Sequence, residues 1–269
     1  MDRRLLATLI IFKSNIKGGI RKTSSSPYQK QLEIDLPIVG YNKLSIADYP
    51  DNLCATVIVP GCNFRCPFCS KEKLIHHYIP MEKIPVADYL QMVYPRAGFL
   101  GGVTITGGEP TLHDYLPDFL KELKFQGYKV KIDTNASKPR VLQRLLERGL
   151  VDYFSVFLVA PIHRYPEVAR YRIEPELMRK SIQIIRKSNI PREWVAMPVP
   201  GINEIEDIEM IAQSVAGARR FIIRNFQPEQ ASNPKCAEIE PFSSQELEEI
   251  RSRVAPYFHE VLIEDREES

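Results

Sequence analysis

The sequence contains no apolar stretch long enough to cross a membrane, which needs about 20 consecutive apolar residues. The nearest approach is residues 5–12, which follow Arg3 and Arg4 and precede Lys13 and Lys17. No small-residue cleavage pattern of a secretory signal follows this segment. We therefore expect it to be a strand or helix packed on the domain, with a signal or membrane-contact segment as the alternative. We expect a cytoplasmic protein with no membrane partner.

An excess of charge of one sign is also lacking. Lysine and arginine together number 36 and aspartate and glutamate 34, so the formal net charge is +2. Domains that bind nucleic acid usually present a clustered basic face. The overall charge does not support such a face, and we expect no nucleic-acid partner. Hydrophobic residues make up 44% and charged residues 26% of the 269 positions, which is enough for a full core.

Cysteine is scarce, and its distribution argues against a disulfide framework. The five cysteines are an odd number, and three of them, Cys62, Cys66 and Cys69, stand within eight residues. Crowded thiols of this kind are typical of a metal or redox site in a reducing compartment. Cys54 lies inside an apolar run, and we expect it to be a buried core thiol.

Apolar runs rich in β-branched residues alternate with amphipathic segments along most of the chain. Strands are predicted at residues 53–59, 102–106, 128–133, 153–160, 194–197 and 221–223. Helices are predicted near residues 117–126, 141–146, 175–185, 205–211 and 243–254. This alternation indicates an α/β fold with a parallel sheet and helical crossovers. An open doubly wound sheet and a full or partial barrel are both compatible with the pattern.

Polar residues follow the first three predicted strands, each at the carboxyl end. The cysteines follow the strand at 53–59, residues 106–110 follow the second strand, and Asp133 ends the third. In parallel α/β folds the carboxyl ends of the strands form one face, where ligands bind. We therefore expect these three segments, which are far apart in sequence, to meet at one site.

The cysteine segment is compatible with two kinds of metal site. A structural zinc ion prefers four protein ligands, so three cysteines would need a partner such as His76 or His77. An iron–sulfur cluster held by three cysteines leaves one iron open to a substrate or cofactor. The glycines in residues 106–110 favour the cluster, because glycine lacks a Cβ and lets the backbone approach a ligand closely. Glu109 adds a negative charge there, which indicates a ligand with an ammonium group.

Together these motifs resemble the radical S-adenosylmethionine superfamily. The match consists of Cys62-x3-Cys66-x2-Cys69, with Phe68 before the last cysteine, and Gly107-Gly108-Glu109-Pro110 after the next strand. Within the superfamily the chain is most similar to activating enzymes of glycyl-radical proteins. These include the anaerobic ribonucleoside-triphosphate reductase activating proteins and the pyruvate formate-lyase activases. The resemblance extends over roughly residues 39–230.

The resemblance implies a partial (β/α)6 barrel with parallel strands and helices outside. It implies an N-terminal extension and lead-in at residues 1–50, a core at 51–230, and a C-terminal helix and tail packed on the core at 231–269. A [4Fe-4S] cluster and S-adenosylmethionine are the implied cofactors, and the cofactor would chelate the fourth iron. The implied cluster ligands are Cys62, Cys66 and Cys69.

The resemblance also implies which residues meet S-adenosylmethionine. Gly107, Gly108 and Glu109 would meet its amino end, and Asp133 would lie near its carboxylate, with or without a cation between them. The candidates for the nucleoside side are Phe68, Val199 and Gln227. No other catalytic residue is implied, since the cofactors carry the chemistry.

The implied reaction is an oxidoreductase reaction. An electron donor such as flavodoxin or ferredoxin reduces the cluster, which splits the sulfonium of S-adenosylmethionine into methionine and a 5′-deoxyadenosyl radical. The radical takes a hydrogen atom from the substrate, while the protein orients the cofactor and excludes water. In the activases the substrate is a glycine Cα, so a glycyl-radical protein is the expected partner.

The chain departs from the activases in two places. Phe157 and Val159 stand where the activases carry an Asp-x-Lys pattern near S-adenosylmethionine. Residues 70–73 also differ from the His-Asn-Pro or Asp-Asn-Pro that follows the third cysteine in the activases. Three interpretations therefore stay open: an activase, a radical S-adenosylmethionine enzyme with another substrate, and a non-catalytic zinc or iron–sulfur binding module.

Overall fold

The sheet of this protein is open and almost entirely parallel. The structure, a computed structural model, describes residues 34–75 and 81–264. In these residues eight strands form one sheet, and their order in the sheet is their order in the chain. The first pairing is antiparallel and the later ones are parallel. The strands are β1 (Gly40–Ser45), β2 (Cys54–Val59), β3 (Gly102–Gly107), β4 (Lys129–Thr134), β5 (Tyr153–Leu158), β6 (Arg192–Ala196), β7 (Arg220–Arg224) and β8 (Glu260–Glu264).

The predicted α/β partial barrel of parallel strands is confirmed, and all the predicted strands are present. The prediction missed the two edge strands, β1 and β8. β1 lies within residues 1–50, which were expected as a lead-in, and β8 lies within residues 231–269. No pairing joins β8 to β1 in the described ranges, so the sheet does not close. The expectations for residues 5–12 and for His76 and His77 lie outside the described residues.

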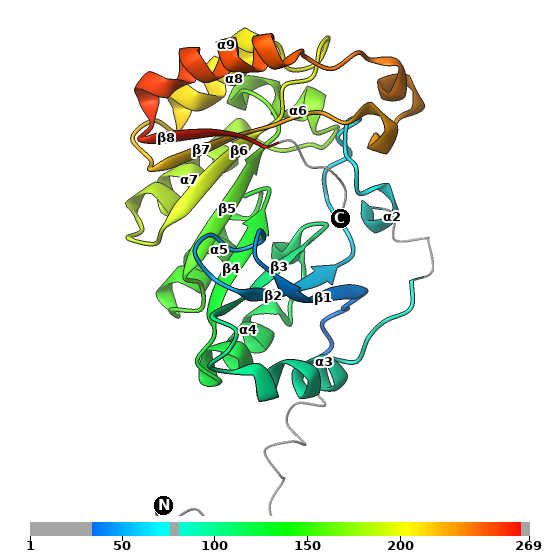
Figure 1. Cartoon of the computed structure of the whole chain (residues 1–269), viewed down its shortest axis with the longest axis vertical. Coiled ribbons are helices and arrows are strands. Elements are labelled where there is room, and N and C mark those ends of the chain that lie inside the picture. The colour runs from blue at the N-terminus through cyan, green and yellow to red at the C-terminus, as the bar shows by residue number, and fades with distance from the viewer. Residues whose placement is uncertain (1–33, 76–80, 265–269) are drawn as a thin grey trace, which may run out of the picture. The chain divides into compact units, whose positions relative to one another are not determined.

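Amphipathic helices connect the strands and cover one face of the sheet (Figure 1). α4 illustrates their origin, because four of its apolar residues recur at helical spacing and are fully buried, namely Leu116, Phe119, Leu120 and Leu123. None of the helices in residues 34–75 and 81–264 has the length and apolar character needed to span a membrane. The longer helices are α3 (Val86–Val93), α4 (Leu116–Phe125), α5 (Pro139–Glu147), α7 (Pro175–Lys187), α8 (Ile205–Ser214) and α9 (Ser244–Val254).

The two faces of the sheet differ in chemistry, because side chains alternate along each strand. The face under the helices is apolar, with fully buried residues such as Val103 on β3 and Ile132 on β4. Barrel interiors are usually filled by bulky apolar side chains, but here the opposite face carries many polar and charged groups. We call this the polar face. It comprises Thr104, Thr106, Lys131, Asp133, Ser155, Glu193, Arg220 and Arg224.

Candidate active site

A pocket of about 230 Å³ lies at the carboxyl ends of the strands, and we call it the central pocket. All three segments expected to meet at one site border it. The cysteine loop follows β2, the glycine pair spans the end of β3, and the third segment lies at the end of β4. The residues of these segments that border the pocket are Cys62, Cys66, Cys69, Gly107, Gly108, Asp133, Thr134 and Asn135.

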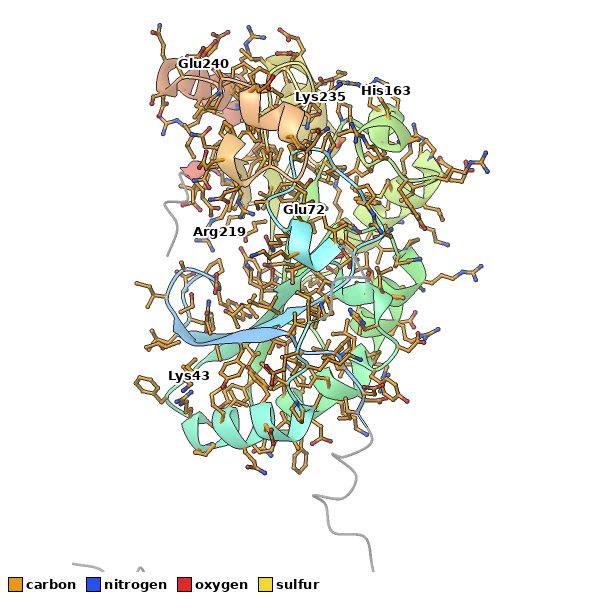
Figure 2. All side chains as sticks on the ribbon, turned by 90° about the vertical axis from the view of Figure 1, so that its right-hand side faces the viewer. Lys43, Glu72, His163, Arg219, Lys235 and Glu240 are labelled. Carbon is orange, nitrogen blue, oxygen red and sulfur yellow. The ribbon has the colours of Figure 1, made fainter. Side chains whose placement is uncertain are left out.

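The cysteine loop is held by parts of the chain that are distant in sequence. The Arg65 nitrogen donates to the Ala169 carbonyl at 2.7 Å. The Ser232 nitrogen donates to the Cys69 carbonyl at 2.8 Å, and the Asn233 nitrogen donates to the Pro67 carbonyl at 3.2 Å. The segment just beyond Asn233 and the short helix α2 (Glu72–Ile75) lie on the same side of the protein; Figure 2 labels Lys235 and Glu72 there.

The cysteine sulfurs lie in an environment suited to metal-bound thiolates. Cys62 Sγ accepts from the Phe64 nitrogen at 3.4 Å and from Asn135 Nδ2 at 3.7 Å, and Cys69 Sγ accepts from the Lys71 nitrogen at 3.4 Å. Such N–H donors stabilise the charge on cluster sulfurs and tune the reduction potential. Without a metal, burial and the nearby Glu109 raise the pKa of Cys62 to about 11. The thiol set therefore fits an iron–sulfur cluster, whose iron would replace the thiol protons.

All five cysteines are free in the structure. Cys54 is fully buried in β2, as predicted. The zinc alternative depended on His76 or His77, which the structure does not describe. In the described part of the chain, no group of three or more His, Cys, Asp or Glu side chains is placed to hold a single metal ion.

The glycine pair at the end of β3 is required by the chain's own backbone. A Cβ on Gly107 would lie 2.1 Å from the Val59 carbonyl oxygen, and one on Gly108 would lie 2.0 Å from the Gly61 carbonyl oxygen. The Gly108 nitrogen donates to Val59 at 2.8 Å, and the Glu109 nitrogen donates to Gly61 at 2.7 Å. The two glycines therefore let β3 lie directly against the start of the cysteine loop, in addition to bordering the pocket.

Glu109 lies inside the protein and not on the pocket surface. Its side chain is fully buried and is not part of the pocket lining. The carboxylate accepts hydrogen bonds from the backbone nitrogen and hydroxyl of Thr111, from the Thr134 hydroxyl at 2.8 Å and from the Asn135 nitrogen at 2.6 Å. Burial raises its pKa, although these bonds oppose the shift. Glu109 thus joins the ends of β3 and β4, and the sequence alone had placed its charge on the ligand face.

Asp133 borders the pocket and belongs to a charged network on the polar face. Its Oδ1 lies 2.8 Å from Lys131 Nζ, which in turn lies 3.5 Å from Glu193. The Tyr153 hydroxyl also donates to Glu193, at 3.2 Å. Burial would raise the pKa of Asp133, but the Lys131 and Lys71 charges hold it below its usual value. The prediction missed Lys131 and Glu193, although Lys131 precedes Asp133 by two positions and so shares its strand face.

The residues expected on the nucleoside side separate in the structure. Phe68 and Gln227 border the central pocket, whereas Val199 is fully buried and does not. Phe157 and Val159 both border it. Sequence reasoning named neither Asn135 nor Arg224 as a site residue, yet both border the pocket.

Arg224 brings a positive charge to the wall that contains Phe157. Its guanidinium carbon lies 5.7 Å from the centroid of the Phe157 ring. Its Nη2 lies 3.0 Å from Glu264 Oε2 on β8. The charges on this side of the pocket therefore come from β7 and β8 and not from β5. The sequence could have indicated this position of Arg224, because side chains alternate along a strand. Arg220 and Arg224 of β7 therefore lie on the same face of the sheet.

Comparison with known proteins identifies the family. The model of the radical SAM superfamily matches residues 56–215, more than half of the chain. The chain therefore belongs to the radical SAM superfamily, whose enzymes use a [4Fe-4S] cluster and S-adenosylmethionine. The matched residues include the cysteine loop, the glycine pair and Asp133.

Two relatives carry names of activating enzymes. A protein of Methanocaldococcus jannaschii, provisionally named a glycyl-radical enzyme activating enzyme, is 29% identical over 232 residues, covering 84% of this chain and 95% of that protein. The pyruvate formate-lyase-activating enzyme of Staphylococcus epidermidis is 33% identical over 81 residues, covering 28% of this chain and 32% of that enzyme.

A solved structure supports the fold. Streptococcus suis SuiB, bound to S-adenosylmethionine, matches with a TM-score of 0.58 at 16% identity, over 77% of this chain. The match covers 48% of SuiB, so this chain spans about half the length of that protein. At this identity the likeness concerns the architecture, which is the partial barrel described above.

Proposed function

We propose that this radical SAM enzyme activates a glycyl-radical protein by removing a hydrogen atom from a glycine Cα. The observation that carries the activase role is the match to the Methanocaldococcus jannaschii relative over 95% of its length. A match of that extent includes the strands on both sides of the pocket, and not the cofactor motifs alone. The partner would be a glycyl-radical protein, and the electron donor a small redox protein such as flavodoxin or ferredoxin.

Cys62, Cys66 and Cys69 would hold the cluster. When bound, the cluster supplies the electron that cleaves the sulfonium of S-adenosylmethionine to methionine and a 5′-deoxyadenosyl radical. The chain's own contribution is to hold the three thiolates in place. The N–H donors from Phe64 and Asn135 stabilise the thiolate of Cys62 and reduce its protonation.

The remaining pocket residues would orient S-adenosylmethionine. Gly107 and Gly108 offer backbone groups next to the cysteine loop, and Asp133 exposes a carboxylate at the pocket surface. Phe68 and Gln227 would border the nucleoside. Glu109 would act indirectly, by fixing the segment that contains Asn135.

A second candidate function is radical chemistry on a different substrate. The observation that favours it is the wall of Phe157, Val159 and Arg224, where the resembled activases carry an acidic and a basic residue on one strand. A pocket wall with a different charge pattern suits a different substrate for hydrogen-atom removal. The cleavage of S-adenosylmethionine would be the same for either substrate.

Two assays on anaerobically reconstituted enzyme test both candidates. Reduced enzyme with S-adenosylmethionine should yield 5′-deoxyadenosine. Mixed with the glycyl-radical protein from the same genome, it should also yield a glycyl signal in electron paramagnetic resonance spectra. 5′-Deoxyadenosine without the glycyl signal would support the second candidate. If an intact cluster yields no 5′-deoxyadenosine, both candidates fail and a binding module is left.

Two cysteine variants serve as matched controls for these assays. Cys66→Ala removes a thiol that borders the pocket and should abolish both the cluster and the activity. Cys54→Ala removes a buried thiol on β2 that does not border the pocket, and it should retain the cluster. Visible absorption and iron content per chain give the cluster occupancy of each variant.

A further inference from the structure

A second pocket, of about 320 Å³, lies at the opposite end of the strands from the central pocket, and we call it the basal pocket. It is bordered by Tyr153, Arg192 and Arg220, which are the first residues of β5, β6 and β7. Its volume falls in the range of small-molecule sites, about 300–1,000 Å³. Ligands of parallel α/β folds usually bind at the carboxyl ends of the strands. The polar groups gathered at these amino ends are therefore not explained by the radical SAM site.

The basal pocket has an excess of positive charge. Of the described residues on its border, three are arginines, Arg192, Arg219 and Arg220, and one is acidic, Asp51. Arg219, which Figure 2 labels, is exposed. Arg220 pairs with Glu260 at 2.7 Å. Neither Arg192 nor Arg219 forms an ion pair within the described part of the chain, so two guanidinium charges at this pocket lack a carboxylate partner there.

The guanidinium of Arg192 is surrounded by neutral groups. Its Nη1 donates to the carbonyls of Ser188 at 3.2 Å and Ile190 at 3.3 Å, and its Nη2 donates to that of Arg186 at 3.3 Å. Its Nε is buried and has no hydrogen-bond partner in the residues that the structure describes. Burial lowers the pKa of Arg192, and the charge of Arg186 lowers it further. A bound anion would compensate this charge.

Glu193 joins the basal pocket to the central pocket. Its Oε2 lies 3.9 Å from Arg220 Nη1 and accepts from the Tyr153 hydroxyl at 3.2 Å, and both of these residues border the basal pocket. Its Oε1 lies 3.5 Å from Lys131 Nζ, which pairs with Asp133 at 2.8 Å. Glu193, Lys131 and Asp133 border the central pocket. One buried carboxylate therefore contacts residues of both pockets.

We propose that the basal pocket binds a phosphate-bearing small molecule, and that Glu193 couples this binding to that of S-adenosylmethionine. Guanidinium groups bind phosphate through paired N–H donors that match its geometry. A phosphate monoester carries a charge of about −1.5 to −2 at pH 7, which balances the two unpaired guanidiniums. The inference goes beyond the proposed function, because it holds whichever substrate the enzyme acts on.

The coupling has a direction that follows from the charges. A phosphate beside Arg220 would compete with Glu193 for the guanidinium, and the released carboxylate would attract Lys131 away from Asp133. Asp133 would then offer more of its negative charge to the central pocket. Since S-adenosylmethionine carries a positive sulfonium, phosphate should strengthen its binding.

Calorimetric titration of inorganic phosphate into the cluster-loaded protein tests the site. Arg219→Gln should raise Kd about 10-fold, the loss of one charge-assisted hydrogen bond. Arg251→Gln is the matched control, because it removes a half-exposed arginine that borders neither pocket, and Kd should change less than about twofold. Wild-type protein without saturable binding in the millimolar range, or an equal Kd in Arg219→Gln, would overturn the proposal.

Acetate at the same ionic strength tests the chemical class of the ligand. It carries one negative charge and two acceptor oxygens, so it should bind at least about 10-fold more weakly than phosphate. Acetate that binds as tightly as phosphate would overturn the phosphate assignment.

The affinity for S-adenosylmethionine with and without saturating phosphate tests the coupling. In wild-type protein phosphate should lower this Kd about fivefold, and S-adenosylmethionine should lower the Kd of phosphate by the same factor. Glu193→Gln should still bind phosphate, but the coupling should fall below about twofold. No coupling in wild type, or equal coupling in Glu193→Gln, would overturn the role of Glu193. A phosphate that raises the Kd of S-adenosylmethionine would show competition in the central pocket and overturn the basal site.

Discussion

The carboxylate of Glu109 accepts a 2.6 Å hydrogen bond from the backbone nitrogen of Asn135. The side chain of the same Asn135 donates to Cys62 Sγ at 3.7 Å and to Asn63 Oδ1 at 3.0 Å. The acidic residue of the glycine-rich motif is therefore linked through one residue to a cysteine of the metal-binding loop. This link implies that Glu109 organises the site from within the protein.

Glu109→Gln should destabilise the protein. The amide nitrogen would face one donor, the Asn135 nitrogen, in place of Oε2, or three donors in place of Oε1. A buried donor without an acceptor costs about 1–3 kcal/mol. We expect the free energy of unfolding of the metal-free protein to fall by about 2 kcal/mol in urea titrations. Glu176→Gln is the control, because Glu176 is 74% exposed and its ion pair is with Arg179 on the surface, so it should change stability by less than about 0.5 kcal/mol. Equal stability of the two variants would contradict the role of Glu109.

The effect of Glu109→Gln should depend on pH. Burial raises the pKa of Glu109 above its usual 4.5, so the folded chain binds this proton more tightly than the unfolded chain. The resulting stabilisation is fully present below about pH 4.5 and is lost as the pH rises through the raised pKa. Glutamine does not titrate. The stability difference between wild type and variant should therefore shrink as the pH rises above 4.5, the usual pKa of a glutamate. A difference that grows over this range would mean that the four hydrogen bonds outweigh burial.

Gly108→Ala should prevent the cysteine loop from docking on β3. The new Cβ would lie 2.0 Å from the Gly61 carbonyl oxygen, a backbone atom that cannot move without breaking its bond to Glu109. We expect a loss of about 3 kcal/mol or more, at the upper end of overpacking costs, and a loss of bound iron after reconstitution. Gly149→Ala tests the backbone effect alone, since Gly149 has φ +62° and no atom within 4 Å of an added Cβ. It should cost about 1 kcal/mol and leave iron binding intact.

Asn135→Ala should make the reduction potential of the cluster more negative. Its amide N–H stabilises the negative charge on Cys62 Sγ, which increases on reduction. A hydrogen bond worth about 1 kcal/mol corresponds to roughly 40 mV for one electron. Redox titration followed by electron paramagnetic resonance measures this shift. Asn63→Ala is the control, because Asn63 shares the network through Ser137 but makes no bond to a sulfur through its side chain. Equal shifts in both variants would assign the effect to the network and not to the N–H···S bond.

Most of the fold could be predicted because its central strands are apolar on at least one face and its helices are amphipathic. β1 and β8 could not, because they are edge strands with mixed polar sequences, Gly40–Ser45 and Glu260–Glu264, and little burial. These two strands form because they pair with β2 and β7. The intrinsic β-strand propensity of a segment does not reveal such pairing. The eight-residue helix α3 was missed as well.

The meeting of the cysteine, glycine and aspartate segments could be predicted, since parallel topology brings strand ends together. The direction of individual side chains could not. Glu109 turns inward because Thr111, Thr134 and Asn135 offer it four donors, and two of these residues belong to another strand end. Lys71 reaches β3 only because the loop folds back, which spacing along the chain does not reveal.

The hydrogen bonds from Ser232 and Asn233 to the cysteine loop have a consequence for biosynthesis. Ser232 Oγ also donates to the Cys66 carbonyl, 166 residues earlier in the chain. Domains begin to fold during synthesis, from the N-terminus. The loop therefore emerges from the ribosome long before the residues that complete its backbone contacts. Iron delivered to the nascent chain would meet thiols in an unfinished loop, so cluster insertion should follow the release of the full-length polypeptide.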